Sequence, residues 1–72
     1  NPTGGVATTE DMKGLADLLR GTRVALFSDE PYCHMAWEGK HHTPPAQPGM
    51  LEQSVACYTF SKSYSMSGWR LG

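Results

Sequence analysis

The spacing of apolar residues near the start of the chain predicts a helix between Thr8 and Gly21. Thr8 and Asp11 form a Thr-x-x-Asp sequence, in which side chains satisfy the free N–H groups of the first helical turn. Gly21 is expected to end the helix, and Leu18 is expected to widen its apolar face. The rest of that face follows the helical spacing i, i+3, i+4 and i+7 and consists of Met12, Leu15, Ala16 and Leu19.

Two further apolar runs predict strands. Val24–Phe27 is short, continuous and apolar, which is typical of a parallel strand that is buried on both faces. Ser54–Phe60 contains β-branched and aromatic residues that favour a second strand. Several Gly and Pro residues interrupt residues 32–50, and we expect mostly loop there. A helix, a strand, a long connection and a second strand are the order of elements in an α/β sheet.

Polar residues follow each of the two predicted strands. One group surrounds Asp29, and the other surrounds Lys62. In open α/β sheets, ligands bind beyond the C-terminal ends of the strands. Both groups are therefore expected to lie at a ligand site.

The size and charge of the chain exclude several classes of function. It has 72 residues and a formal charge of −1, so it has no basic surface for nucleic acid or an anionic membrane. No apolar run approaches the ~20 residues that span a bilayer, and no secretory signal pattern occurs. The chain opens on Asn1-Pro2-Thr3-Gly4 and ends on Arg70-Leu71-Gly72, and we expect it to be a piece of a larger domain.

Cysteine and histidine residues are too scattered for a disulfide framework or a metal site. Cys33 and Cys57 have no CxxC partner, and free buried thiols are the default in the reducing cytoplasm, where we expect this protein. His41 and His42 are adjacent, so their side chains point in different directions, and His34 is seven residues away from His41. We expect no bound metal, and a polar loop that contains two histidines.

Lys62 has the strongest chemical context in the chain. Taken alone, a lysine in a turn is most often a solvated surface charge. Arg70 follows eight residues later, two positions after Gly68, and a guanidinium group together with several hydroxyls can hold an anion. A lysine beside that anion can form a covalent imine with an aldehyde on the same molecule. The hydroxyls belong to Ser61, Ser63, Ser65 and Ser67.

The segment Thr59–Gly72 resembles the lysine-attachment signature of the class I/II aminotransferases, which are fold-type I pyridoxal 5′-phosphate (PLP) enzymes. In that signature, Lys follows a small residue, and a Gly, Ala, Asn or Arg comes six residues later. An Arg comes eight residues after the Lys and precedes an aliphatic residue and Gly or Ala. The chain departs from the pattern at Thr59, where Ser or Gly is usual, but it keeps a hydroxyl. The resemblance implies that Lys62 binds PLP as a Schiff base and is the catalytic general base and acid. It also implies that Arg70 clamps the phosphate, aided by Thr59 and Ser61.

Two other sequences resemble elements of the same family, in the family's order. Asn1-Pro2-Thr3-Gly4 is similar to its Asn-Pro-x-Gly turn, which implies that Asn1 hydrogen-bonds the ring hydroxyl oxygen of PLP. Asp29-Glu30-Pro31-Tyr32 is similar to its Asp-x-x-Tyr element. This implies that Asp29 pairs with the protonated pyridine nitrogen and that Tyr32 reaches the ring oxygen. In isolation, a turn or capping role for Asp29 would be the better interpretation.

The resemblance covers essentially the whole chain and implies both a fold and an activity. The expected fold is α/β, with residues 1–72 forming part of the PLP-binding large domain of an aspartate aminotransferase-like transferase with a mostly parallel central sheet. The expected activity moves an amino group between an amino acid and a 2-oxo acid, with PLP as the cofactor. The complete enzyme is expected to be a homodimer, and the 72 residues alone are expected to be inactive.

Two alternatives share these sequences. A carbon–sulfur lyase or a synthase of the same fold uses the same electron sink, and the outcome is decided by groups outside this stretch. The aminotransferase-like sensor domain of a transcription regulator binds PLP without turnover. Such domains tend to have Pro-Gly in a shorter lysine-to-arginine turn, whereas here the spacing is eight residues and the sequence is Ser67-Gly68.

The remaining conspicuous residues are given ordinary roles. Glu30 is next to Asp29 and so faces elsewhere in an extended chain, where a solvated or locally hydrogen-bonded role is expected. Trp37, Tyr64 and Trp69 are expected to be packing residues.

Overall fold

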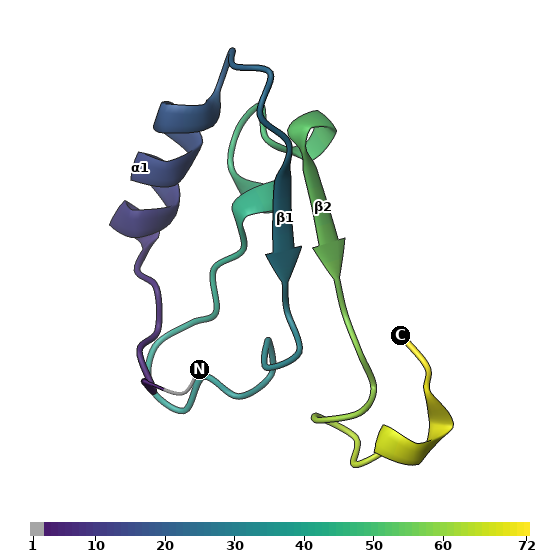
Figure 1. Ribbon diagram of the computed structural model, residues 1–72. Coiled ribbons are helices and arrows are strands. Elements are labelled where there is room, and N and C mark those ends of the chain that lie inside the picture. Colours follow the sequence, from purple (N-terminus) through teal and green to yellow (C-terminus); the bar gives the residue numbers. More distant parts are fainter. Residues whose placement is uncertain (1–2) are drawn as a thin grey trace.

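The protein forms a small α/β unit, seen in a computed structural model that describes residues 3–72 (Figure 1). Its two strands pair in parallel, with Leu26 opposite Ser54 and Asp29 opposite Cys57. The parallel pairing of two strands joined by a long connection confirms the α/β order that the sequence predicts. The elements are helix α1 (Thr9–Leu19), strands β1 (Leu26–Asp29) and β2 (Ser54–Cys57), and the 3-10 helices η1 (Pro44–Ala46), η2 (Leu51–Gln53) and η3 (Ser67–Trp69).

Helix α1 begins with the capping box that the sequence predicts. The Thr8 hydroxyl accepts a hydrogen bond from the Asp11 backbone N–H at 3.1 Å, and the Asp11 carboxylate accepts one from the Thr8 backbone N–H at 2.7 Å. Ala16 is buried on the predicted apolar face. The prediction that Leu18 widens this face is wrong, because Leu18 is exposed. Its position two residues from Ala16 places it ~200° around the helix.

The C-terminal end of α1 is tied to the segment that precedes β2. The Gln53 side-chain amide donates hydrogen bonds to the carbonyl oxygens of Leu19 at 2.9 Å and Val24 at 2.7 Å. The Arg20 guanidinium donates two hydrogen bonds to the Pro48 carbonyl oxygen, at 3.1 and 2.9 Å. The bond to Leu19 satisfies a carbonyl group that the helix end leaves free, and the others fix the helix end to the neighbouring loops.

Strand β1 begins later than the sequence predicts. Val24–Phe27 was the expected strand, but the ladder runs from Leu26 to Asp29. The carbonyl oxygen of Val24 is occupied by the Gln53 side chain, and pairing with β2 starts at Leu26. As a result, Asp29 is the last residue of the strand and does not follow it.

Strand β2 ends earlier than the predicted Ser54–Phe60 segment, at Cys57. The last hydrogen bond of the ladder between β1 and β2 is donated by the Glu30 backbone N–H to the Cys57 carbonyl oxygen at 2.9 Å. The carbonyl oxygen of Glu30 then accepts a hydrogen bond from the Cys33 backbone N–H at 3.4 Å, so it is engaged in a turn and not in the ladder. This turn therefore limits the length of both strands.

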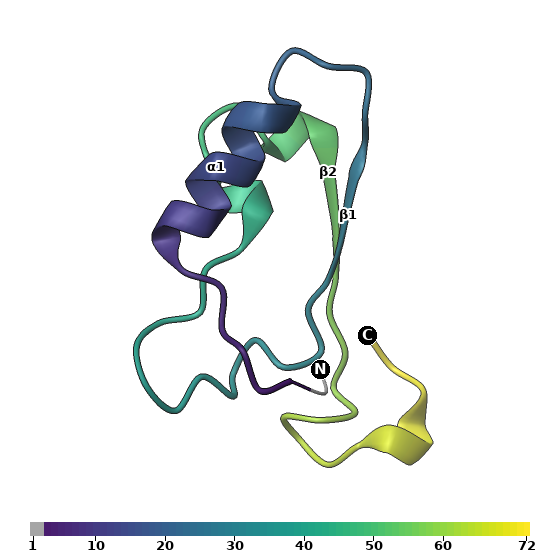
Figure 2. The ribbon, with the colours of Figure 1, turned by 60° about the vertical axis from the view of Figure 1, so that its left-hand side comes forward.

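Only one face of the sheet is covered by the described residues. Figure 2 shows the sheet almost edge-on, with α1, η1 and η2 on one side of it. The covered positions alternate with exposed ones along both strands, and Phe27 and Val55, which lie opposite each other, are exposed. The prediction that the first strand is buried on both faces is therefore wrong within residues 3–72.

The buried interior between α1 and the sheet is small. Met50 and Ala16 are its buried hydrophobic residues, and Glu30 is buried as well. Pro44, in η1, completes this interior. None of the helices in residues 3–72 has the length and apolar character needed to cross a lipid bilayer.

Candidate functional site

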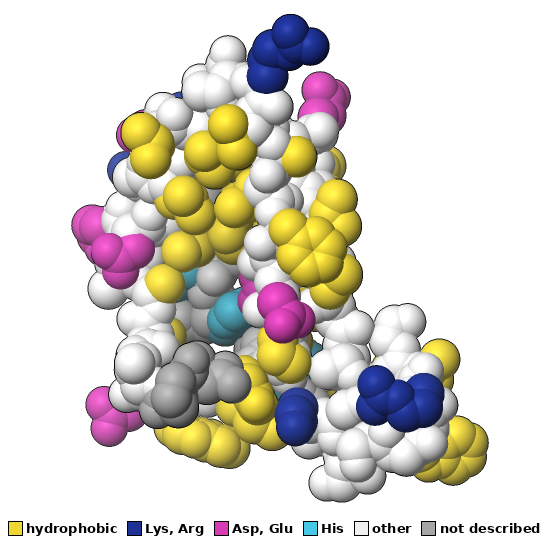
Figure 3. All heavy atoms as spheres, viewed as in Figure 1, with side chains coloured by type: hydrophobic (Ala, Val, Ile, Leu, Met, Phe, Trp, Pro, Cys, Tyr) yellow, Lys and Arg dark blue, Asp and Glu magenta, His cyan; other side chains and the backbone are white. Residues whose placement is uncertain are grey.

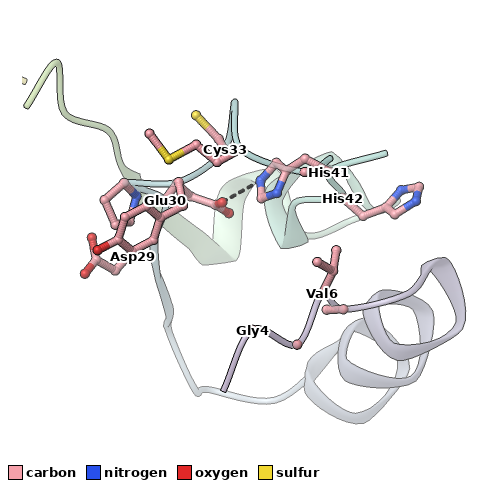
Figure 4. A pocket seen from close by; sticks show the side chains of 13 residues that line it. Gly4, Val6, Asp29, Glu30, Cys33, His41 and His42 are labelled. Atoms are coloured by element: carbon pink, nitrogen blue, oxygen red, sulfur yellow. Dashed lines mark ion pairs between the residues drawn. The ribbon is translucent and has the colours of Figure 1, made fainter. Parts of the chain in front are cut away.

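A cleft of about 510 Å³ lies beyond the C-terminal end of β1 (Figure 4). Three segments line it, residues 4–7 before α1, residues 29–33 at the end of β1, and residues 41–42 of the long connection. Met35 and Ala36 complete its apolar part. The cleft has the position that ligands occupy in open α/β sheets.

Asp29 and Tyr32, two of the predicted site residues, both line this cleft. Asp29 ends β1, and among residues 3–72 no group donates a hydrogen bond to its carboxylate. Tyr32 lies in the turn that follows Pro31, and its carbonyl oxygen accepts a hydrogen bond from the Met35 backbone N–H at 2.8 Å. A strand end and a tight turn thus bring a carboxylate and a phenol to one cavity.

Asn1, a third predicted site residue, lies outside the described residues, as does Pro2. The described part of that turn begins at Thr3, whose hydroxyl accepts a hydrogen bond from the Gly5 backbone N–H at 3.3 Å. Gly4 has a φ of +76°, a conformation that favours glycine. Gly4 and Gly5 both line the cleft.

Lys62 lies in a closed loop that follows β2. The Phe60 backbone N–H donates to the Leu71 carbonyl oxygen at 3.1 Å, which joins the two ends of the loop. A side chain at Gly72 would collide with the Tyr58 carbonyl oxygen, so the two arms approach each other closely there. Lys62 is exposed, and its carbonyl oxygen accepts a hydrogen bond from the Ser65 backbone N–H at 3.3 Å.

The other three predicted residues of this loop are Thr59, Ser61 and Arg70. The Thr59 hydroxyl lies 2.9 Å from the Ser61 hydroxyl and accepts a hydrogen bond from the Ser61 backbone N–H at 3.1 Å. The Arg70 guanidinium donates to the Ser67 carbonyl oxygen at 3.0 Å. The Ser63 hydroxyl is buried without a hydrogen-bond partner among residues 3–72, so this loop has an unsatisfied polar atom beside Lys62.

The same loop contains unusual backbone conformations. Ser65 and Arg70 have φ values of +54° and +53°, and they are the two non-glycine residues with positive φ in residues 3–72. Such conformations cost about 1–3 kcal/mol each and persist where surrounding contacts impose them, often at ligand sites. The lysine loop is therefore held in a specific shape.

The structure brings together some of the predicted site residues and not others. The cleft includes Asp29 and Tyr32, whereas the residues of the lysine loop do not line it. Both groups leave the sheet at the same edge, because the parallel strands end together (Figure 1). Lys62 comes five residues after Cys57, the residue that pairs with Asp29. The residues that do not line the cleft are Lys62, Thr59, Ser61 and Arg70.

Glu30 is a buried residue of the cleft, with only 5% of its surface exposed. Burial raises the pKa of its carboxyl group. Hydrogen bonds from Ser28 and Thr43, with the attraction and hydrogen bond of His41, outweigh this effect and hold the pKa below its ordinary value of 4.5. The expectation of a locally hydrogen-bonded role is confirmed, and the expectation of a solvated one is wrong. The two-residue period of an extended chain predicts the inward direction, because Glu30 continues the covered positions Leu26 and Ser28.

The histidines of the long connection make separate contacts. His41 Nε2 lies 2.6 Å from Glu30 Oε2, and His42 Nε2 lies 3.1 Å from the Thr9 hydroxyl. In residues 3–72, no group of three His, Cys, Asp or Glu residues is placed to hold a metal ion. Cys33 and Cys57 are free thiols, and Cys57 is exposed, so the expectation that it is buried is wrong.

The expected packing residues differ in their surroundings. Tyr64 contacts the rings of Phe60 and His34, with centroid distances of 5.4 and 6.1 Å. Trp37 and Trp69 are 87% and 74% exposed, so the prediction that they pack is wrong within the described part of the chain.

The chain belongs to the aminotransferase class I and II family, which it matches along residues 1–72. It is 37% identical over 73 residues to the aromatic-amino-acid aminotransferase 2 of Thermococcus litoralis. It is also 37% identical over 75 residues to the aspartate/prephenate aminotransferase of Cereibacter sphaeroides. With the aspartate aminotransferase of Pyrococcus horikoshii, the identity is 38% over 72 residues.

The match covers all of this chain but only part of each relative. It extends over 19%, 19% and 18% of those three proteins, so the chain spans about a fifth of the length of the relatives it matches. No solved structure matches the chain significantly. The family is PLP-dependent and implies a fold-type I PLP domain, of which the described residues form a small α/β section with a two-stranded parallel sheet.

Proposed function

We propose that this chain is part of the PLP-binding large domain of an aminotransferase that moves an amino group between an amino acid and a 2-oxo acid. The observation that supports this most strongly is that an Asp-x-x-Tyr turn and a lysine loop leave one parallel sheet at the same edge. The proposal includes the mostly parallel central sheet of the complete domain. It also includes a homodimer as the complete enzyme.

The residues of the cleft fit PLP. A cavity of about 510 Å³ falls within the range of roughly 300–1,000 Å³ that is usual for ligand pockets. Its polar groups include the Asp29 carboxylate, which has no partner among residues 3–72, and its walls include Val6 and Met35. A flat, partly charged heterocycle needs both kinds of contact.

Asp29 has the role of holding a proton on the pyridine nitrogen. A carboxylate close to that nitrogen stabilises its protonated form, because opposite charges raise the pKa of the base. When PLP is bound, it supplies an electron sink for the electrons of the substrate Cα–H bond. The phenol of Tyr32, with the amide of Asn1, donates a hydrogen bond to the ring hydroxyl oxygen and stabilises its anionic form.

Lys62 has two roles in the proposal. Its ε-amine would hold the cofactor covalently when no substrate is bound. Once free, the same amine would act as the general base and acid at the substrate Cα. Arg70 binds the phosphate, and the Thr59 and Ser61 hydroxyls assist it, which agrees with the closeness of those two hydroxyls in the loop.

The proposal is tested by measuring amino transfer by the complete protein that contains this chain, from a panel of amino acids to 2-oxoglutarate as the amino acceptor. Lys62→Ala should abolish amino transfer, and Asp29→Asn should lower kcat on the order of 100-fold. Lys13→Ala and Asp17→Asn, at exposed positions of α1, are the matched controls and should change kcat by less than about twofold. Full transfer activity in Lys62→Ala would contradict the proposal. Cleavage of a carbon–sulfur bond without amino transfer would instead assign the protein to the lyases.

A further inference from the structure

Glu30 joins three segments of the chain at the wall of the cleft. Its Oε1 atom accepts hydrogen bonds from the hydroxyls of Ser28 and Thr43, both at 2.7 Å. Its Oε2 atom lies 2.6 Å from His41 Nε2. Ser28 belongs to β1, whereas Thr43 and His41 come from the middle of the long connection, just before η1. The carboxylate therefore closes the loop between β1 and η1.

The main chain of Glu30 is fixed as well. Its N–H donates to the Cys57 carbonyl oxygen at 2.9 Å, and its own carbonyl oxygen accepts a hydrogen bond from the Cys33 N–H at 3.4 Å. Asp29 directly precedes this residue, and Tyr32 follows it by two positions. Because both the backbone and the side chain of Glu30 are bound, its neighbours on either side have little freedom to rotate.

The two adjacent carboxylates have separate partners. Figure 4 shows the Glu30 carboxylate reaching toward His41, while the Asp29 carboxylate points the other way. Three protein groups saturate Glu30, and so it is not available to a ligand. Loss of one of these donors would leave a buried charge incompletely paired, which a local shift of residues 29–32 would relieve.

We propose that Glu30 is a positioning residue, which acts through Ser28, Thr43 and His41 to hold Asp29 and Tyr32 in the orientation that receives the pyridine ring. This inference rests on the proposed function. It assigns a purpose to a buried carboxylate whose hydrogen-bonding partners all come from the protein.

The experiment compares the complete protein with three variants in the presence of PLP. His41→Ala removes one donor, and Thr43→Val removes another with little change of shape. His41→Gln keeps an N–H donor near the position of Nε2. Glu52→Gln, at an exposed position of η2, is the control. The dissociation constant of PLP and the visible circular dichroism of the bound cofactor are measured, since the latter reports the orientation of the ring.

His41→Ala and Thr43→Val should each weaken PLP binding about tenfold and reduce the visible dichroism of the bound form. His41→Gln should bring the dissociation constant of PLP and the visible dichroism back to within about threefold of the wild-type values. Glu52→Gln should match the wild type in both measurements. A lower melting temperature with unchanged affinity and dichroism would show a merely structural role and overturn the inference, while the proposed function would stand. A wild-type protein that shows no PLP absorption would overturn both.

Discussion

Asp29 and Glu30 show how neighbouring residues of one type can have different physical roles. In an extended chain, successive side chains point to opposite sides, so one carboxylate turns to the open face and the other to the covered face. The covered carboxylate is bound by three side chains, whereas no group among residues 3–72 donates a hydrogen bond to the open one. Two adjacent acidic residues thus have different surroundings, which is why the proposal gives Asp29 a ligand-binding role and Glu30 a positioning role.

The lowered pKa of Glu30 predicts a specific dependence of stability on pH. Because the folded-state pKa lies below the ordinary value of 4.5, the ionised carboxylate stabilises the folded state above that pH. This stabilisation is lost as the pH falls through the folded-state pKa. Urea unfolding of the complete protein between about pH 7 and pH 3 should show a steeper loss of stability below 4.5 in the wild type than in Glu30→Gln.

The exposed Glu38 provides the control for this measurement. Glu38→Gln should follow the wild-type curve throughout. Parallel curves for the wild type and Glu30→Gln would contradict the stabilising role of the Glu30 carboxylate.

Helix α1 is the element whose stability depends most clearly on a short sequence signal. Thr8→Ala removes the hydroxyl that accepts from the Asp11 N–H and deletes half of the capping box. The expected loss is about 1 kcal/mol in the free energy of unfolding of the complete protein. Lys13→Ala, in the exposed middle of the helix, should change that energy by less than about 0.5 kcal/mol. Equal effects of the two substitutions in urea unfolding would refute the capping role.

The elements differ in how far the sequence could predict them. The cap and the apolar face of α1 depend on residues within a few positions of one another, and both were predictable. The strand limits depend on groups distant in sequence. Gln53 occupies the carbonyl oxygen of Val24, and the turn that begins at Glu30 ends the ladder for a strand that starts more than twenty residues later. Local patterns contain no information about such contacts.

In the candidate site, too, features that depend on neighbouring residues were predictable, and features that depend on residues distant in sequence were not. The directions of Asp29 and Glu30 follow from the period of the strand, which is local. The partners of Glu30 could not be predicted, because Thr43 is 13 residues away and the loop between them has no regular period. The exposed aromatic residues, such as Trp37, were predicted to pack because an aromatic side chain in a loop usually has a partner.

At the scale of the whole molecule, residues 3–72 bury very little apolar surface. Met50 and Ala16 are the buried hydrophobic residues, whereas hydrophobic side chains gather on the surface over the helix and the strands (Figure 3). Histidine side chains are visible in the hollow below this cluster (Figure 3). A chain with so small a core lacks the burial that offsets the entropy of folding.

The isolated 72-residue polypeptide is therefore expected not to fold cooperatively. Its amide proton spectrum should show poor dispersion, and its circular dichroism should change gradually with urea, without a sigmoidal transition. A sharp transition that coincides in both measurements would show that the sheet face around Phe27 and Val55 needs no cover, contrary to this expectation.

Every role proposed for the cleft and the lysine loop depends on covalent binding of PLP by the ε-amine of Lys62. That bond can be located by reduction of the PLP-loaded complete protein with borohydride, followed by proteolysis and mass spectrometry of the labelled peptide. A pyridoxyl group is expected on Lys62 and none on Lys13 or Lys40, the other two lysines of the chain. A label on either of those two residues, with Lys62 unmodified, would contradict this expectation.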